Sequence, residues 1–151
     1  MAKPLLLVED NPHDLELTLH ALTKHRLGNE VVVARDGEAA LDFLFARGSF
    51  ADRAPGNPSL IMLDLKLPKI DGIEVLKVIR GTPELAQIPV VMFTASRMEA
   101  DVASAYAGGV NSYVVKPLDF QELIRVVADL GCYWTVHNEP PQGSARVPQL
   151  K

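Results

Sequence analysis

The sequence IMLDLKLPKIDG, residues 61–72, carries a short apolar run that stops at a carboxylate, Asp64, and then turns. A continuous apolar run of this length is typical of a strand buried on both faces. A charge at the end of such a strand is costly unless a group outside the sheet uses it. The Asp71-Gly72 pair marks a turn before the next apolar period. The stretch predicts a buried strand that presents Asp64 to a ligand.

Five such runs occur along the chain and alternate with segments of helical period. The runs are LLLV (5–8), VVV (31–33), LIML (60–63), VVMF (90–93) and YVV (113–115). The helical segments begin after Pro12, Gly37 and Gly72, at Met98 and at Asp119. Since crossovers between parallel strands are right-handed, five repeated βα units predict an α/β doubly wound sandwich.

Composition limits the class of protein. The chain has 151 residues, of which 48% are hydrophobic and 23% charged, enough to bury a core. A net charge of −4 argues against a nucleic-acid partner. No apolar run approaches the ~18 residues of a membrane span. We expect a cytoplasmic protein with one folded domain over residues 1–137 and a mobile proline-rich tail over residues 138–151.

Polar side chains follow four of the strands, at the edge where ligands bind in an open α/β sheet. They are Glu9, Asp10, Asp64, Thr94 and Lys116. Three carboxylates brought together repel one another, and a divalent cation such as Mg²⁺ removes that penalty. A lysine and a threonine hydroxyl are suited to orienting a phosphoryl group. The combination indicates phosphoryl transfer to an aspartate.

Four motifs in order resemble the signatures of the response-regulator receiver domain. They are LLLVEDNP (5–12), LDLKLPKIDG (63–72), VVMFTAS (90–96) and YVVKP (113–117). The resemblance covers about residues 4–134. It implies a flavodoxin-like (βα)5 fold with a five-stranded parallel sheet of order 2-1-3-4-5 and, in this chain, an extended fifth helix.

The resemblance also implies roles for the residues at the strand ends. Asp64 would accept a phosphoryl group from a sensor histidine kinase. Asp10, Asp64 and the backbone carbonyl of Lys66 would hold Mg²⁺, and Glu9 would act through a metal-bound water.

Three further residues would bind and report the phosphoryl group. Thr94 and Lys116 would bind its oxygens, and Tyr113 would swing inward as Thr94 moves toward it. The Lys116–Pro117 peptide bond would be cis.

Features outside the site look most like the small regulators paired with phytochrome-type histidine kinases. These features are LPKIDG, the loop 48–58, NSYVVKP (111–117) and GCYW (131–134). A receiver domain with no fused output module would act through protein contacts.

The segment after Asp119 carries two apolar stripes. Phe120, Leu123, Ile124 and Val127 are expected to face inward. A second stripe suggests an exposed patch that another surface covers, either the tail or a second copy of the chain. The hypothesis is a homodimer through this helix, the helix 98–107 and the last strand. Its contact residues would be Val102, Tyr106, Val126, Leu130, Tyr133 and Trp134.

Two other functions compete with this interpretation. An Mg²⁺-dependent phosphohydrolase that forms an aspartyl phosphate would need a second carboxylate two residues after Asp64. Lys66 is found there, so we expect only self-phosphotransfer and autodephosphorylation. A scaffold independent of phosphate is disfavoured because the acceptor, the acidic pair, Thr94 and Lys116 are all present.

Overall fold

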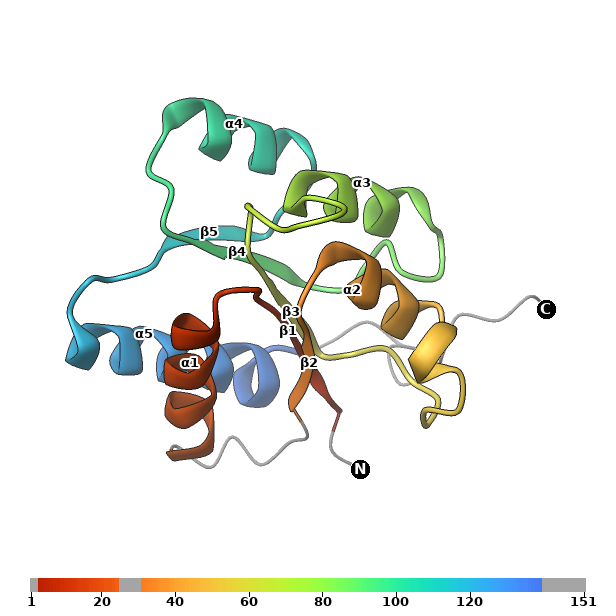
Figure 1. The fold of residues 1–151 in the computed structure, drawn as a ribbon, viewed down its shortest axis with the longest axis horizontal. Helices are drawn as coiled ribbons and strands as arrows, with labels where there is room; N and C mark the ends of the chain where they lie inside the picture. Colours follow the sequence, from red (N-terminus) through yellow and green to blue (C-terminus); the bar gives the residue numbers. More distant parts are fainter. Residues whose placement is uncertain (1–2, 25–30, 140–151) are drawn as a thin grey trace.

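Five parallel strands form a sheet in the computed structural model, which describes residues 3–24 and 31–139 (Figure 1). The strands are β1 (Leu5–Val8), β2 (Val31–Ala34), β3 (Leu60–Leu63), β4 (Val90–Thr94) and β5 (Ser112–Val115). Their order, β2-β1-β3-β4-β5, confirms the order expected from the sequence. Because β1 pairs with β2 on one side and β3 on the other, the order in which strands are added to the sheet reverses between β1 and β3. Ligands bind at such a switch point.

Five α-helices of the described residues cover the two faces of the sheet (Figure 1). α1 (Pro12–Lys24) and α5 (Phe120–Cys132) lie side by side on one face. The other face carries α2 (Gly37–Leu44), α3 (Gly72–Gly81) and α4 (Glu99–Ala107). A 3-10 turn, η1 (Gly48–Phe50), follows α2, and a π-helical turn, η2 (Tyr133–His137), continues α5. Within the described residues, no helix is both long and apolar enough to cross a membrane.

Each face of the sheet has its own apolar core. Leu6 and Val8 of β1 pack toward α2, α3 and α4, whereas Leu5 and Leu7 pack toward α1 and α5. All residues of β1, β3 and β4 are buried, which explains why their sequences are continuous apolar runs. Truncating one of these large side chains to alanine costs about 2–5 kcal/mol of stability.

Short polar side chains begin four of the helices and so fix the ends of the loops beside the strands. They are Asn11, Asp36, Asp71 and Asp119, which accept hydrogen bonds from the amides of Asp14, Ala39, Glu74 and Glu122. Each bond satisfies an amide that has no partner inside its helix. The helix start predicted at Asp119 is confirmed, and Asp119 is its N-cap.

α5 packs on the sheet largely as expected, with one exception. Leu123, Ile124 and Val127 are buried, but Phe120 is 43% exposed. Phe120 is the first residue of α5, and burial begins one turn later. The inward position predicted for Phe120 is therefore wrong. Helical spacing predicts which residues lie on the same side of a helix, but it does not predict where the sheet beneath that side begins.

The second apolar stripe of α5 is divided between core and surface. Val126, Leu130 and Trp134 are half-buried and pack against the core shared with α1. Tyr133 is 53% exposed and stands edge-on to Trp134. On α4, Tyr106 is 52% exposed and Val102 is half-buried. Residues 140–151 of the expected tail lie outside the described residues.

Candidate functional site

The carboxyl ends of β1, β3, β4 and β5 open onto a crevice of about 710 Å³. Its lining residues are Asp10, Asn11, Pro12, Asp14, Asp64, Lys66, Thr94, Ala95, Ser96, Met98 and Lys116. Glu9 is only 1% exposed and is joined to the crevice through Lys116. The strand-end side chains that the sequence predicted to converge are therefore neighbours.

Sheet-like hydrogen bonds continue past the ends of the strands and fix three of these residues. The amides of Glu9, Asp64 and Lys116 donate to the carbonyls of Ala34, Val8 and Thr94, at 3.0, 3.1 and 2.8 Å. Each side chain thus leaves a rigid edge of the sheet. Polar groups placed in advance need little reorganisation when charge develops beside them.

A glycine at the start of α3 allows this helix to approach the end of β3. The Gly72 amide donates to the Leu65 carbonyl at 2.8 Å. A Cβ atom at position 72 would lie 2.3 Å from the carbonyl oxygen of Asp64 and 2.9 Å from Leu65 Cα. The Asp71-Gly72 pair therefore both caps α3 and makes room for the backbone of Asp64.

Lys116 is the cation at the centre of the crevice. Its Nζ atom donates to Glu9 Oε1 at 2.6 Å, to Asp64 Oδ2 at 3.0 Å and to Asp14 Oδ2 at 3.0 Å. The side chains of Lys116, Glu9 and Asp64 are 8%, 2% and 10% exposed. Sequence reasoning missed Asp14. It lies four residues after Asp10, in the first turn of α1 that starts beside the end of β1, and that position was the available signal.

Burial and mutual contact shift the proton equilibria of Glu9 and Lys116. Burial raises the pKa of Glu9 to about 7, although the hydrogen bond from Lys116 lowers it, and the charge of Asp64 raises it further. Burial lowers the pKa of Lys116, but the hydrogen bond to Glu9 and the attraction of Asp64 and Glu9 outweigh this and raise it above its usual value. Lys116 is therefore a fixed cation, whereas Glu9 changes charge near neutral pH.

Three carboxylates form a group suited to a divalent cation. One oxygen from each of Glu9, Asp10 and Asp64 lies within 4.8 Å of the others. Of the four carboxylates in this region, Glu9, Asp14 and Asp64 contact the single ammonium of Lys116. Oxygen ligands and excess negative charge are what Mg²⁺ and Ca²⁺ select. The residues present therefore fit a hard divalent ion, which would compensate charge that Lys116 leaves unbalanced.

The switch residues predicted on β4 and β5 are linked through Ser96. Thr94 is buried, and its Oγ1 accepts a long hydrogen bond, 3.4 Å, from the Ser96 amide. The Tyr113 hydroxyl donates to the Ser96 carbonyl at 3.0 Å. The Ser96 hydroxyl in turn donates to Asp101 in the first turn of α4. One segment, residues 94–96, thus connects the crevice to α4 and to Tyr113.

Two predicted features near the crevice turn out differently or stay open. No cis peptide bond occurs among the described residues, so the cis bond predicted at Lys116–Pro117 is wrong. The trans form is intrinsically favoured even before proline, and Lys116 reaches its partners with it. Lys66 lines the crevice with an exposed side chain, and the metal-binding role of its carbonyl stays a prediction.

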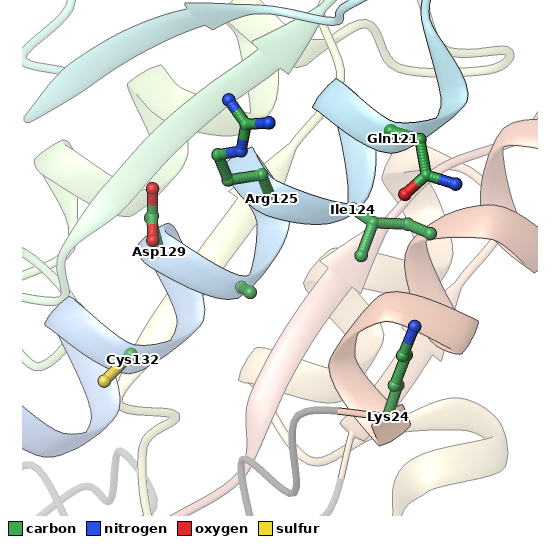
Figure 2. A pocket seen from close by; sticks show the side chains of 7 residues that line it. Lys24, Gln121, Ile124, Arg125, Asp129 and Cys132 are labelled. Carbon is green, nitrogen blue, oxygen red and sulfur yellow. The ribbon is translucent and has the colours of Figure 1, made fainter.

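A second hollow, of about 500 Å³, lies between α5 and the end of α1 (Figure 2). Its lining mixes charged, polar and apolar groups, namely Lys24, Gln121, Ile124, Arg125, Ala128, Asp129 and Cys132. Figure 2 shows Lys24 reaching from α1 and the other labelled side chains coming from α5. Within residues 3–24 and 31–139, the grouping of three potential metal ligands occurs at the crevice and not here.

Residues 5–128 match the sequence profile of the response regulator receiver domain. The response regulator Rcp1 of Synechocystis sp. is 40% identical over 132 residues, which cover 87% of this chain and 88% of Rcp1. A crystal structure of Mn²⁺-bound Rcp1, 38% identical, has a TM-score of 0.84 over 92% of this chain and 99% of that one. The bacteriophytochrome response regulator RtBRR is 56% identical, with a TM-score of 0.76 over 95% of this chain and 87% of that one. The phosphorylated cyanobacterial phytochrome response regulator RcpA is 37% identical, with a TM-score of 0.87 over 94% of this chain and 100% of RcpA.

Proposed function

This chain belongs to the response regulator receiver domain family, and on that basis we propose that Asp64 accepts a phosphoryl group from a sensor histidine kinase. Members of the family are phosphoacceptors that partner with histidine kinases and bind a divalent metal ion. One observation carries the assignment to Asp64. Its carboxylate lies at the end of a central strand, 3.0 Å from Lys116 Nζ, in an open crevice beside two further carboxylates.

In the proposed transfer, a lone pair of an Asp64 carboxylate oxygen attacks phosphorus as the phosphorus–nitrogen bond to the donor histidine breaks. The bonding electron pair stays on the histidine nitrogen, and because the other ring nitrogen of the donor carries a proton, the products are an acyl phosphate and a neutral imidazole. Lys116 bonds Asp64 before transfer and remains beside the phosphoryl oxygens after it. The hydroxyl of Thr94, on the neighbouring strand, is the second donor. Both groups stabilise charge that spreads over the transferred group.

Mg²⁺ is the metal we assign to this site, held by Glu9, Asp10, Asp64 and the carbonyl of Lys66. The support is the set of oxygen ligands and the Mn²⁺ bound by the similar Rcp1. When bound, the ion supplies charge neutralisation for the transferred group. Glu9 would act through a water on the ion, since it is the most deeply buried of the carboxylates and already bonds Lys116.

The proposed switch couples Thr94 to Tyr113. The hydrogen bond that the Thr94 hydroxyl accepts from the Ser96 amide is long, at 3.4 Å, so this hydroxyl is easily drawn toward a phosphoryl oxygen. That movement shifts residues 94–96, whose Ser96 carbonyl holds the Tyr113 hydroxyl. Tyr113 then turns inward, and the surface formed by α4 and β5 changes. A free-energy gap of a few kcal/mol between the two states is sufficient for such a switch.

We assign the input to a phytochrome-type histidine kinase, because RtBRR and RcpA are response regulators of phytochromes and each resembles this chain over most of its length.

Output would follow through protein contacts, with a homodimer over α4, β5 and α5. Tyr106 and Tyr133 are its exposed aromatic groups. Sedimentation of Tyr106→Glu and Tyr133→Glu tests the dimer, because neither change puts a charge into the core. An unchanged sedimentation coefficient would exclude this surface. The cytoplasmic location stays a prediction.

A phosphohydrolase is the competing function. The position two residues after Asp64 is Lys66, whose exposed ammonium cannot act as the carboxylate acid/base of such enzymes. We therefore propose self-phosphotransfer and autodephosphorylation only. Multiple turnovers of a chromogenic phosphate ester would favour the hydrolase instead.

Phosphotransfer from candidate histidine kinases, followed by mass spectrometry, tests the main proposal. Label is expected on Asp64 in the wild-type chain and on no residue of Asp64→Asn. Asp52→Asn removes an exposed carboxylate far from the crevice and should be labelled normally. Label on another residue of the wild-type chain would overturn the assignment. So would Asp64→Asn labelled to the same extent as wild type.

A further inference from the structure

Asp14 contacts the ammonium beside the proposed phosphoacceptor, although neither the transfer nor the metal site assigns it a role. Its Oδ2 atom accepts a hydrogen bond from Lys116 Nζ at 3.0 Å. Asn11 accepts from the Asp14 amide at 3.0 Å, which fixes the first turn of α1 and the direction of the carboxylate. The Asp14 side chain is 33% exposed, more than those of Glu9 and Asp64, so it is the outermost carboxylate on Lys116.

Every donor of the Lys116 ammonium has a carboxylate partner. The group carries three N–H bonds, and Glu9, Asp14 and Asp64 each lie within 3.0 Å of it. A phosphoryl oxygen on Asp64 needs one of these donors. Glu9 is buried, whereas Asp14 lines the crevice together with Asp64. On transfer the donor now shared with Asp64 can pass to a phosphoryl oxygen, and of the other two donors the one shared with Asp14 is the more accessible.

Resting on the function proposed above, we infer that Asp14 is a positioning residue that competes with the phosphoryl group for Lys116. Asp14 Oδ2 and Asp64 Oδ2 are each 3.0 Å from Nζ, so they lie within about 6 Å of each other. Phosphorylation replaces the single negative charge of Asp64 with nearly two on the phosphoryl group, within that range of Asp14. The two groups repel each other, and Asp14 weakens the hold of the crevice on the phosphoryl group.

For a cation the effect has the opposite sign. Asp14 shares the Lys116 charge and so reduces the attraction that this ammonium exerts on Glu9 and Asp64. The oxygens of Glu9 and Asp64 are then freer to bind a metal ion, and the negative charge of Asp14 favours the ion further. Asp14 therefore strengthens metal binding while it weakens phosphoryl binding. A residue that merely stabilised the fold would change both affinities in the same direction.

Calorimetric titration of the Asp14→Asn and Asp14→Ala variants tests this pair of effects. Mg²⁺ alone is titrated first, and then beryllofluoride, a phosphoryl mimic, at saturating Mg²⁺. For effective dielectric constants between about 20 and 80, one unit charge about 6 Å away predicts roughly threefold to hundredfold tighter beryllofluoride binding and a loss of Mg²⁺ affinity of at least that size. The half-life of the acyl phosphate should lengthen by a similar factor. Glu16→Gln, which removes an exposed charge from the same helix, is the matched control and should change neither affinity.

The outcomes separate this inference from the function on which it rests. Opposite changes in the two affinities, in both Asp14 variants and not in Glu16→Gln, support it. Affinities that do not change in the Asp14 variants, or that both fall, overturn this inference. If the wild-type chain still binds beryllofluoride in that case, the phosphoacceptor role stands. A wild-type chain that fails to bind beryllofluoride at all removes the phosphoacceptor role and this inference together.

Discussion

In the absence of metal, the free energy of unfolding of Glu9→Gln minus that of wild type should be larger at pH 8 than at pH 5. Burial raises the pKa of Glu9 from its usual 4.5 to about 7. Between these values the folded chain holds a proton on Glu9 that the unfolded chain has released. Raising the pH through this window therefore destabilises the wild type. A glutamine has no such proton, and its shape is nearly the same.

The size of the effect follows from the two pKa values. Each pKa unit corresponds to about 1.4 kcal/mol, so the stability of the glutamine variant relative to wild type should rise by up to about 3 kcal/mol between pH 4.5 and 7. Above about pH 8 the difference should be constant. The raised pKa of Lys116 adds nothing here, since Lys116 is charged in both states throughout this range and its contribution is lost only as the pH rises above 10.5.

Urea unfolding in EDTA at pH 5, 6, 7 and 8 measures this difference. Other titrating groups cancel, because they are common to both proteins. Glu16→Gln is the control for removal of a carboxylate in general and should give a flat difference. A flat difference for Glu9→Gln would mean that Glu9 stays ionised against Lys116 at all four pH values, and this would refute the reasoning. With saturating Mg²⁺ the wild-type dependence should shrink, because the cation favours the ionised carboxylates.

The other predictions concern stability and the shape of the site. Lys116→Met leaves Glu9, Asp64 and Asp14 without their shared cation, and should cost about 3–5 kcal/mol at pH 7 by urea unfolding, with partial recovery in Mg²⁺. Gly72→Ala forces a Cβ to 2.3 Å from the Asp64 carbonyl, and should cost about 1–3 kcal/mol and slow phosphotransfer. At Gly81, at the other end of α3, a Cβ meets nothing within 4 Å, so Gly81→Ala should not destabilise and should leave transfer unchanged. Asp119→Ala removes the cap of α5, and thermal unfolding should show a loss of about 1 kcal/mol.

The fold could be predicted from the sequence because the physical signals are local. β1, β3 and β4 are buried on both faces, and this forces continuous apolar runs that end where polar residues begin. Helix starts are marked by side chains that cap them, as at Asp71 and Asp119. Phe120 shows where this reasoning stops, since its burial depends on how far α5 extends beyond the sheet and not on its own neighbours in sequence.

The sequence predicted which residues of the candidate site lie at the strand ends, but not which side chains or backbone groups they contact. Sequence order places Glu9, Asp64 and Lys116 at one edge of the sheet, because parallel strands end together. It does not say which carboxylates a flexible lysine side chain will contact. Asp14 reaches Lys116 from a helix, and no strand rule applies to it. The bond between Tyr113 and the Ser96 carbonyl likewise depends on a backbone group with no signature in the sequence.

The path of the loop between α2 and β3 also depends on contacts that the sequence does not reveal. Arg53 donates to the Phe43, Ala54 and Gly56 carbonyls, and its guanidinium lies 4.2 Å from the centre of the Phe43 ring. A glycine- and proline-rich composition predicts a loop, but not the single side chain that anchors it. A cation buried against an aromatic ring and three carbonyls explains why this loop has a defined path.

The position of Lys116 implies that the metal and the phosphoryl group bind cooperatively. Its ammonium contacts Glu9, Asp14 and Asp64, so its three donors are committed to carboxylates. A divalent ion at Glu9, Asp10 and Asp64 would compensate those charges and release donors of Lys116 for phosphoryl oxygens. Linkage requires the reverse as well, so a group that engages Lys116 raises the affinity for the ion by the same factor. Asp14 would oppose this coupling, because it is not among the residues assigned to the ion and would still hold one donor.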